Sequence, residues 1–253
     1  MKEIIVRADD LGFSEGINYG IEKSCRQGII RSVGVMTNME ATEHGYNLIK
    51  DLPLCLGLHT NICAGRPLCD PRTIPSICDD SGFLKRSAVY RQAAREGRDF
   101  IVLEEVIREI EAQYQAFVRL TGEKPHYFEG HAVSSPNFSL GLKTVAESHG
   151  CDFLDFSMNG PIPFRNSKLY VSMNSSAPDY DPFECLKQAA LKDYGDNGYL
   201  MFVCHPGYLD QTILDISSLT MPRPKEVAMC TSPQTIQWLK ENDIRVITYD
   251  DLP

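Results

Sequence analysis

The chain has 253 residues, of which 43% are hydrophobic and 23% charged, with a net charge of −9 and a pI near 5.2. This length suits one large domain with a substantial core, and the acidic balance argues against nucleic acid or an anionic membrane as the main partner. No apolar run approaches the ~18 residues of a membrane-spanning helix, and Met1-Lys2-Glu3 leads into an expected strand rather than a signal peptide. The nine cysteines include no CxxC pair, so a cytoplasmic protein with reduced thiols is expected.

Strands and amphipathic helices alternate along the chain, which is typical of proteins built on a parallel sheet. The first strand is expected at residues 3–8. Ser14 is the expected N-cap of a helix that carries Ile17 and Ile21 on one face and stops at Gly28. Further strands are expected at residues 32–36, 55–59, 152–156, 199–205 and 245–249, with one more ending at His131. Further helices are expected at residues 41–50, 103–120, 137–149, 182–193 and 233–241.

Two long segments lack this alternation. Residues 63–99 are rich in proline, glycine and charge and are too long for an ordinary connection, so a lid or rim insertion is expected there. Residues 207–230 are expected to form a second rim segment. About seven strands remain, which predicts a single domain over residues 1–253 with a parallel sheet, either open or closed into a (β/α) barrel.

Residues that can bind metal or transfer protons follow four of the expected strands. Asp9-Asp10 ends the first strand, and His59, His131 and His205 end three others. Adjacent carboxylates at a strand end repel each other, which favours a role with a cation or in a reaction, although an Asp that caps the next helix is an alternative. A lone His at a strand end is more often structural. Because a closed barrel brings its C-terminal strand ends into one mouth, we favour an irregular, seven-stranded (β/α) barrel over an open sheet.

An Asp with two His is an open set of metal ligands that leaves positions for water and substrate. Such a site polarises a carbonyl, which the hydrolysis of an amide or ester requires. The remaining Asp and the remaining His would then act as base and acid. Two alternatives stay open: metal-dependent hydrolysis of a phosphoester or glycoside, and a sugar-binding protein without turnover.

Several short motifs occur in a characteristic order. They are Ala8-Asp9-Asp10-Leu11-Gly12, Gly57-Leu58-His59-Thr60-Asn61, Gly65-Arg66-Pro67-Leu68, Ile74-Pro75-Ser76, Asp80-Ser81-Gly82-Phe83-Leu84, His205-Pro206-Gly207-Tyr208 with Asp210, and Arg223-Pro224-Lys225-Glu226. In this order they resemble the YdjC-like (ChbG-type) carbohydrate deacetylases, and the resemblance runs across nearly the whole chain.

The resemblance implies an irregular (β/α) barrel related to the NodB-type deacetylases, and removal of acetyl groups from N-acetylated sugars such as chitin-derived oligosaccharides. It implies Asp10, His59 and His131 as ligands of a divalent metal. It also implies Asp9 as the base and His205 as the acid. The metal implied is Mg²⁺, while the two imidazoles also suit Zn²⁺.

Substrate contacts are expected from Arg66, Tyr208, Arg223 and Glu226, and the sugar's length and any phosphate on it are left open, as is a homodimer. One segment departs from the family, which usually shows Asp-Ser-His-x-His-x-His near the fourth strand. This chain has Glu129-Gly130-His131-Ala132-Val133-Ser134-Ser135 instead. The ligand position is kept, but the acid is one carbon longer and two later His are replaced, so hydrogen bonds around the ligands are expected to differ.

Overall fold

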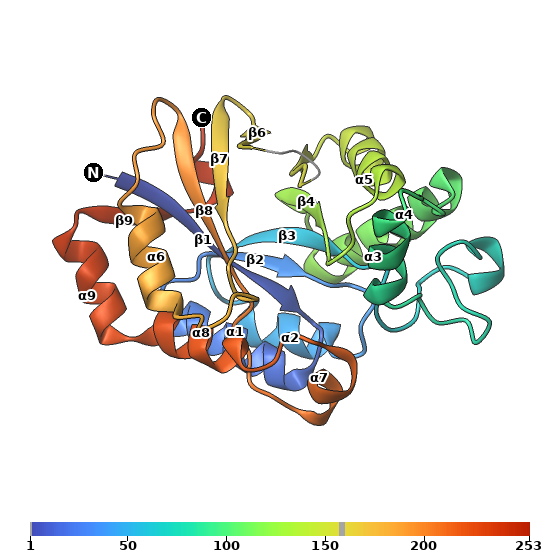
Figure 1. The fold of residues 1–253 in the computed structure, drawn as a ribbon, viewed down its shortest axis with the longest axis horizontal. Coiled ribbons are helices and arrows are strands. Elements are labelled where there is room, and N and C mark those ends of the chain that lie inside the picture. The colour runs from blue at the N-terminus through green and yellow to red at the C-terminus, as the bar shows by residue number, and fades with distance from the viewer. Residues whose placement is uncertain (1, 157–159) are drawn as a thin grey trace. The chain divides into compact units, whose positions relative to one another are not determined.

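The computed structural model describes residues 2–156 and 160–253 (Figure 1). The chain divides into two compact parts. The terminal part contains both chain ends and comprises residues 2–34, 40–56 and 160–253, and the central part comprises residues 35–39 and 57–156. The single domain expected from the length stays a prediction.

The sheet of the terminal part has the strand order β2-β1-β8-β7-β6, with β9 also paired to β1. The strands are β1 (Lys2–Leu11), β2 (Ser32–Val35, whose last residue belongs to the central part), β6 (Ile162–Phe164), β7 (Ser167–Ser172), β8 (Gly198–Cys204) and β9 (Ile244–Ile247). β1 and β8 are parallel, and Ala8 lies opposite Cys204. Asp9 and Asp10, near the end of β1, and His205, directly after β8, therefore lie at the C-terminal ends of neighbouring strands.

The helices of the terminal part are α1 (Glu15–Arg26), α2 (Thr42–Ile49), α6 (Pro182–Ala190), α7 (Gln211–Ile216), α8 (Pro222–Thr231) and α9 (Pro233–Glu241). A short 3₁₀ helix covers Tyr249–Asp251. Ser14 caps α1 as predicted, since its side chain accepts the N–H of Ile17, and Ile17 and Ile21 are buried. Glycine at position 20 allows a close approach, because a methyl group there would lie 2.4 Å from Gly207 Cα. Helix α1 therefore packs directly on the loop that follows His205.

The central part contains the parallel strands β3 (Cys55–Thr60, whose first two residues belong to the terminal part), β4 (Tyr127–Gly130) and β5 (Asp152–Phe153). Its helices are α3 (Ser87–Arg95), α4 (Leu103–Thr121) and α5 (Pro136–Ser148), with a 3₁₀ turn at Pro71–Thr73. Glycine at position 57 makes room for a neighbouring ring, because a Cβ there would lie 2.2 Å from the ring of Tyr127. The β3–β4 register places His59 opposite Glu129.

The described residues contain nine strands where about seven were expected. The additional pair is the antiparallel hairpin β6–β7, where no strand was predicted. The insertion at 63–99 includes helix α3, and the segment 207–230 includes helices α7 and α8. The sequence pattern did not predict helix α8, because prolines occur in its first turn. Proline is nevertheless compatible with that position.

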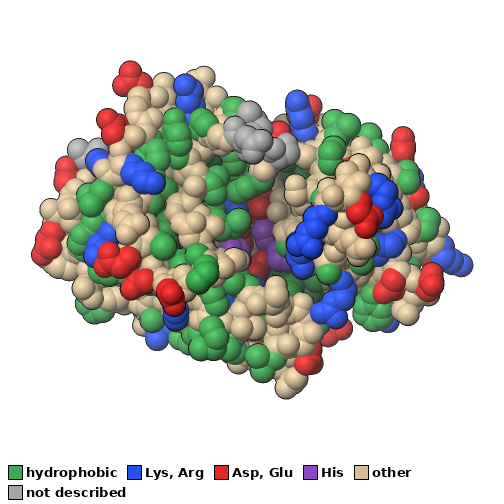
Figure 2. Space-filling model, in the orientation of Figure 1, with side chains coloured by type: hydrophobic (Ala, Val, Ile, Leu, Met, Phe, Trp, Pro, Cys, Tyr) green, Lys and Arg blue, Asp and Glu red, His purple; other side chains and the backbone are tan. Residues whose placement is uncertain are grey.

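Acidic and basic side chains are interspersed over the face of the molecule drawn in Figure 2. Within the described ranges, no helix combines the length and the apolar character that crossing a bilayer requires.

Candidate functional site

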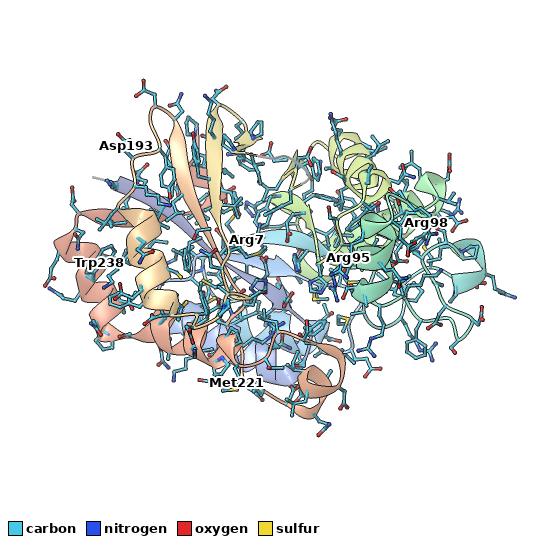
Figure 3. The ribbon with its side chains drawn as sticks, viewed as in Figure 1. Arg7, Arg95, Arg98, Asp193, Met221 and Trp238 are labelled. Atoms are coloured by element: carbon cyan, nitrogen blue, oxygen red, sulfur yellow. The ribbon has the colours of Figure 1, made fainter. Side chains whose placement is uncertain are left out.

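Asp9 lies at the end of β1 with only 2% of its surface exposed. Its Oδ2 accepts a hydrogen bond of 2.7 Å from Nη2 of Arg7, which is buried two residues earlier on the same face of the strand. Arg7 lies near the middle of the ribbon among the strands (Figure 3), and its Nη1 donates to the hydroxyl of Tyr249 at 3.3 Å. The other oxygen, Asp9 Oδ1, accepts no hydrogen bond from any described residue. One oxygen is therefore fixed by an arginine, and the other can accept a proton.

Asp10 is fully buried and has a different environment from its neighbour. Its φ angle is +78°, in the left-handed region that favours glycine. Its Oδ2 accepts a hydrogen bond of 2.8 Å from Nη2 of Arg223 in helix α8. The two adjacent carboxylates are thus held by two different arginines, which suits two different roles.

His205 follows β8, and helix α8 holds its backbone. The N–H of His205 donates to Oε2 of Glu226 at 2.6 Å, and the hydroxyl of Tyr180 donates to Oε1 of Glu226 at 2.8 Å. Burial raises the pKa of the Glu226 carboxyl to about 7, against the lowering effect of these hydrogen bonds and of Arg223.

In the central part, the imidazoles of His59 and His131 face each other. His59 Nε2 lies 2.9 Å from His131 Nδ1, and the rings meet edge to face with centroids 4.9 Å apart. His59 Nδ1 contacts the carboxylate of Glu129, which is buried opposite it in the register. An ionised Glu129 holds the His59 proton on Nδ1, so that Nε2 presents a lone pair toward His131.

This donor set fits a divalent cation. Two imidazole nitrogens that both present lone pairs toward one point repel each other unless a proton or a cation lies between them. A carboxylate on the far nitrogen of a metal-binding His is the usual arrangement that fixes its tautomer. The central part can therefore supply two nitrogen ligands to a cation.

The residues expected to contact substrate fall into two groups. Arg66 is exposed and its guanidinium lies 4.1 Å from the centre of the Phe83 ring, and Tyr208 is 37% exposed. Arg223 and Glu226 are buried, at 2% and 0%, and they contact Asp10 and His205 instead of facing solvent. Sugar contacts by any of the four stay a prediction.

The sequence does not predict a role in the site for two residues, Arg7 and Glu129. Arg7 interrupts an apolar strand two positions before Asp9, which was a usable signal because charged residues are rarely buried without a partner. Glu129 was noticed only as a departure from the family motif. Its contact with His59 depends on the register of two strands about 70 positions apart, which the sequence does not display.

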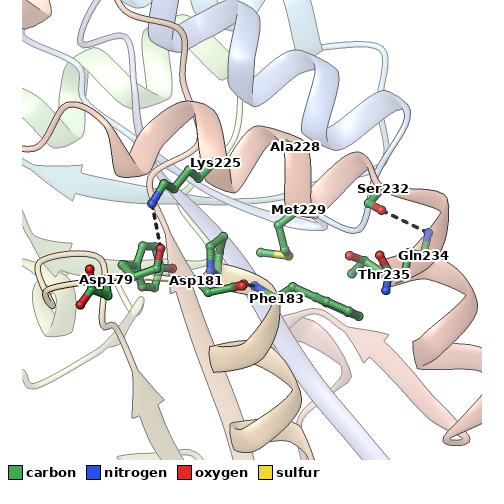
Figure 4. A pocket seen from close by; sticks show the side chains of 11 residues that line it. Asp179, Asp181, Phe183, Lys225, Ala228, Met229, Ser232, Gln234 and Thr235 are labelled. Atoms are coloured by element: carbon green, nitrogen blue, oxygen red, sulfur yellow. Dashed lines mark hydrogen bonds between the residues drawn. The ribbon is translucent and has the colours of Figure 1, made fainter.

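A separate cavity of about 610 Å³ lies in the terminal part (Figure 4). It is lined by Asp179, Tyr180, Asp181, Pro182, Phe183, Lys225, Ala228, Met229, Ser232, Gln234 and Thr235. Lys225 Nζ donates to the carbonyl oxygen of Tyr180 at 3.1 Å across one side of it. The sequence predicts no catalytic or metal-binding role for these residues.

The sequence matches the profile of the YdjC-like protein family over residues 3–241. It is also 30% identical to carbohydrate deacetylase 2 of Listeria innocua over 259 residues, which cover 99% of this chain and 99% of that protein. The chain belongs to the YdjC-like family.

Solved structures share the fold. A protein of Enterococcus faecalis named for cellobiose-phosphate cleavage superposes with a TM-score of 0.80 at 18% identity, over 99% of this chain and 98% of that one. A family 4 carbohydrate esterase of Streptomyces lividans, solved with acetate, superposes with a TM-score of 0.55 at 11% identity, over 99% and 95%. These likenesses confirm the fold class expected from the sequence, an irregular (β/α) barrel.

Proposed function

We propose that this protein is a metal-dependent carbohydrate deacetylase that hydrolyses the acetamido group of N-acetylated sugars, chitin-derived oligosaccharides among them. The observation that carries the proposal is the contrast between the adjacent carboxylates. Asp9 is fixed by Arg7 through one oxygen and Asp10 is held by Arg223, as a base and a metal ligand would require. The carbohydrate deacetylase names of full-length relatives support the same activity.

In this proposal Asp10, His59 and His131 hold the metal. Carboxylate and imidazole donors suit Zn²⁺, and the resemblance noted above points to Mg²⁺. When bound, the cation supplies Lewis-acid polarisation of the acetyl carbonyl. Glu129 keeps the His59 ring in the tautomer and orientation that a ligand needs.

Asp9 accepts the proton of the attacking water at Oδ1, while Arg7 keeps the carboxylate in place through Oδ2. The water oxygen forms a bond to the acetyl carbon, and the bond from that carbon to the sugar nitrogen breaks. His205 donates a proton to the departing nitrogen, so that acetate and a free amino sugar leave. Arg66 and Tyr208, as the exposed candidates, contact the sugar.

Acetate release tests this proposal. The metal-loaded protein is incubated with N-acetylglucosamine, its 6-phosphate and short chitin oligosaccharides, with the Asp9→Asn variant as the matched control. We expect the wild type to release acetate from at least one substrate. We expect no acetate release with the Asp9→Asn variant. Release of inorganic phosphate or of new reducing ends without acetate would instead favour a phosphoester or glycoside hydrolase. Binding without any product would favour a sugar-binding protein.

A further inference from the structure

Two buried residues of helix α8 hold the peptide unit on either side of His205. Glu226 Oε2 accepts the N–H of His205 at 2.6 Å, and Arg223 Nη1 donates to the carbonyl oxygen of His205 at 3.4 Å. Arg223 and Glu226 are three residues apart, so they project from the same face of the helix. The backbone of His205 is therefore held at both its donor and its acceptor.

Arg223 also reaches beyond His205. Its Nη2 donates to Asp10 Oδ2 at 2.8 Å, and its Nε donates to the carbonyl oxygen of Leu219 at 2.8 Å. A guanidinium is planar and rigid, so hydrogen bonds in three directions leave it little freedom. One side chain thus sets the position of Asp10 relative to the backbone of His205.

Tyr180 holds the side chain of Glu226, the second of the two α8 residues that contact the backbone of His205. Its hydroxyl donates to Glu226 Oε1 at 2.8 Å, and its own carbonyl oxygen accepts a hydrogen bond from Lys225 at 3.1 Å (Figure 4). The Tyr180 side chain is buried, and it forms part of the wall of the 610 Å³ cavity. Both oxygens of Glu226 therefore have a donor, and the carboxylate cannot rotate without losing one of them.

Arg223 and Asp10 form a buried ion pair within this arrangement. Replacing buried charged groups by apolar groups of similar size is often neutral or stabilising, so a buried ion pair is weak support for a purely structural role. The groups that it holds are a carboxylate and a histidine at neighbouring strand ends. The loop behind His205 is also closely packed, because Gly207 lies against Gly20 of α1.

We propose that Arg223, Glu226 and Tyr180 are positioning residues of the deacetylation, which place the His205 imidazole relative to Asp10 so that it can protonate the leaving nitrogen. This inference rests on the proposed function and deepens it. None of the three residues needs to touch the sugar. Their effect passes through the backbone of His205 and, for Arg223 alone, through Asp10 as well.

The test uses Tyr180→Phe, which removes one hydroxyl and keeps the ring. The control is Tyr194→Phe, because the hydroxyl of Tyr194 also makes one hydrogen bond, of 2.9 Å to the carbonyl oxygen of Ala189 in the same part of the chain. Both variants are assayed for kcat and KM on an N-acetylated sugar and on p-nitrophenyl acetate, whose leaving group needs no proton. Metal content and melting temperature are measured alongside.

For Tyr180→Phe we expect kcat on the sugar to fall about 10-fold, with KM and metal content unchanged and a much smaller loss on the ester. Tyr194→Phe should change neither substrate. Glu226→Gln, which keeps an acceptor for the His205 N–H, should retain more activity than Glu226→Ala. Arg223→Lys should lower metal content together with kcat, because a single ammonium group cannot replace the forked contacts.

Two results would overturn the inference while leaving the proposed function standing. One is an active wild type in which Tyr180→Phe behaves like Tyr194→Phe. The other is an equal loss on sugar and ester that follows the folded fraction, which would show that the three residues only stabilise the fold. A wild type that releases no acetate from any sugar would overturn the proposed function and the inference with it.

Discussion

His59 and Glu129 lie opposite each other on the parallel strands β3 and β4, and the His59 Nδ1 nitrogen contacts the Glu129 carboxylate. Both side chains are buried, so the contact is shielded from solvent. It determines which nitrogen of His59 can bind a cation, because the proton stays on the nitrogen nearest the carboxylate. The family motif that the sequence resembles would have an aspartate at the position of Glu129, and the longer side chain still reaches the histidine.

Glu129→Gln is expected to weaken metal binding about 10- to 100-fold, because the neutral amide no longer fixes the charge and tautomer of His59. Calorimetric titration of the metal-free protein with Zn²⁺ and with Mg²⁺ measures the change. Glu123→Gln, in an exposed turn of the same part, is the control. An unchanged dissociation constant would mean that Glu129 only packs against His59.

His131→Ala is expected to remove bound metal and activity together while the protein stays folded. His131 lies after the end of β4 and is only partly buried, so its loss leaves the core intact. Asp10→Ala and His59→Ala should lose metal in the same way. Elemental analysis of the purified variants measures their metal content, and circular dichroism checks that they are folded. Full metal occupancy in His131→Ala would exclude this residue as a ligand.

Asp9→Asn is expected to lower turnover by roughly 10²- to 10⁴-fold while metal and sugar still bind, because the amide keeps the size but is no base. The variant should also be less stable by about 2 kcal/mol, since the buried Arg7 loses its ionised partner. Single-turnover assays and chemical denaturation measure the two effects. A change in activity of less than a few-fold would assign Asp9 to a turn cap and place the base elsewhere.

His205→Ala is expected to impair the hydrolysis of an N-acetylated sugar far more than that of p-nitrophenyl acetate. An amine leaves poorly without a proton, whereas nitrophenolate leaves unaided. The ratio of kcat/KM values on the two substrates reports the difference directly. A similar loss on both would mean that His205 acts on the water, the metal or the fold.

The stability of the metal-free protein is expected to depend on pH through Glu226. Burial raises its pKa to about 7 in the folded state, from an ordinary value of 4.5, so folding favours the protonated form. The associated stability is fully present below pH 4.5 and is lost as the pH rises through 7. Thermal melts of the wild type and of Glu226→Gln between pH 4 and 8 should therefore differ in slope, with the wild type losing more stability toward neutral pH. Parallel profiles would show that folding does not raise the pKa of Glu226.

The sequence by itself determined the features that depend on neighbouring residues. Ser14 and the buried Ile17 and Ile21 define helix α1 through a local cap and a local period, and the structure confirms them. Helix α9 begins and ends at the predicted residues 233 and 241 for the same reason. The positions of Asp9, Asp10 and His205 at strand ends were also visible, because an apolar run followed by a polar residue and a turn is a local pattern.

Only the tertiary structure decided which side chains these residues meet. The pairing of Arg223 with Asp10 joins positions 213 apart, and the hydrogen bond from the His205 backbone to Glu226 depends on how α8 packs. The register of β3 on β4 likewise brings Glu129 to His59. Such contacts come from the packing of elements that are distant in sequence. No periodic pattern in the sequence predicts them. Arg223 and Glu226, two of the expected substrate contacts, are buried and have partners inside the fold, because a charged group there needs one, and their contact with a sugar stays a prediction.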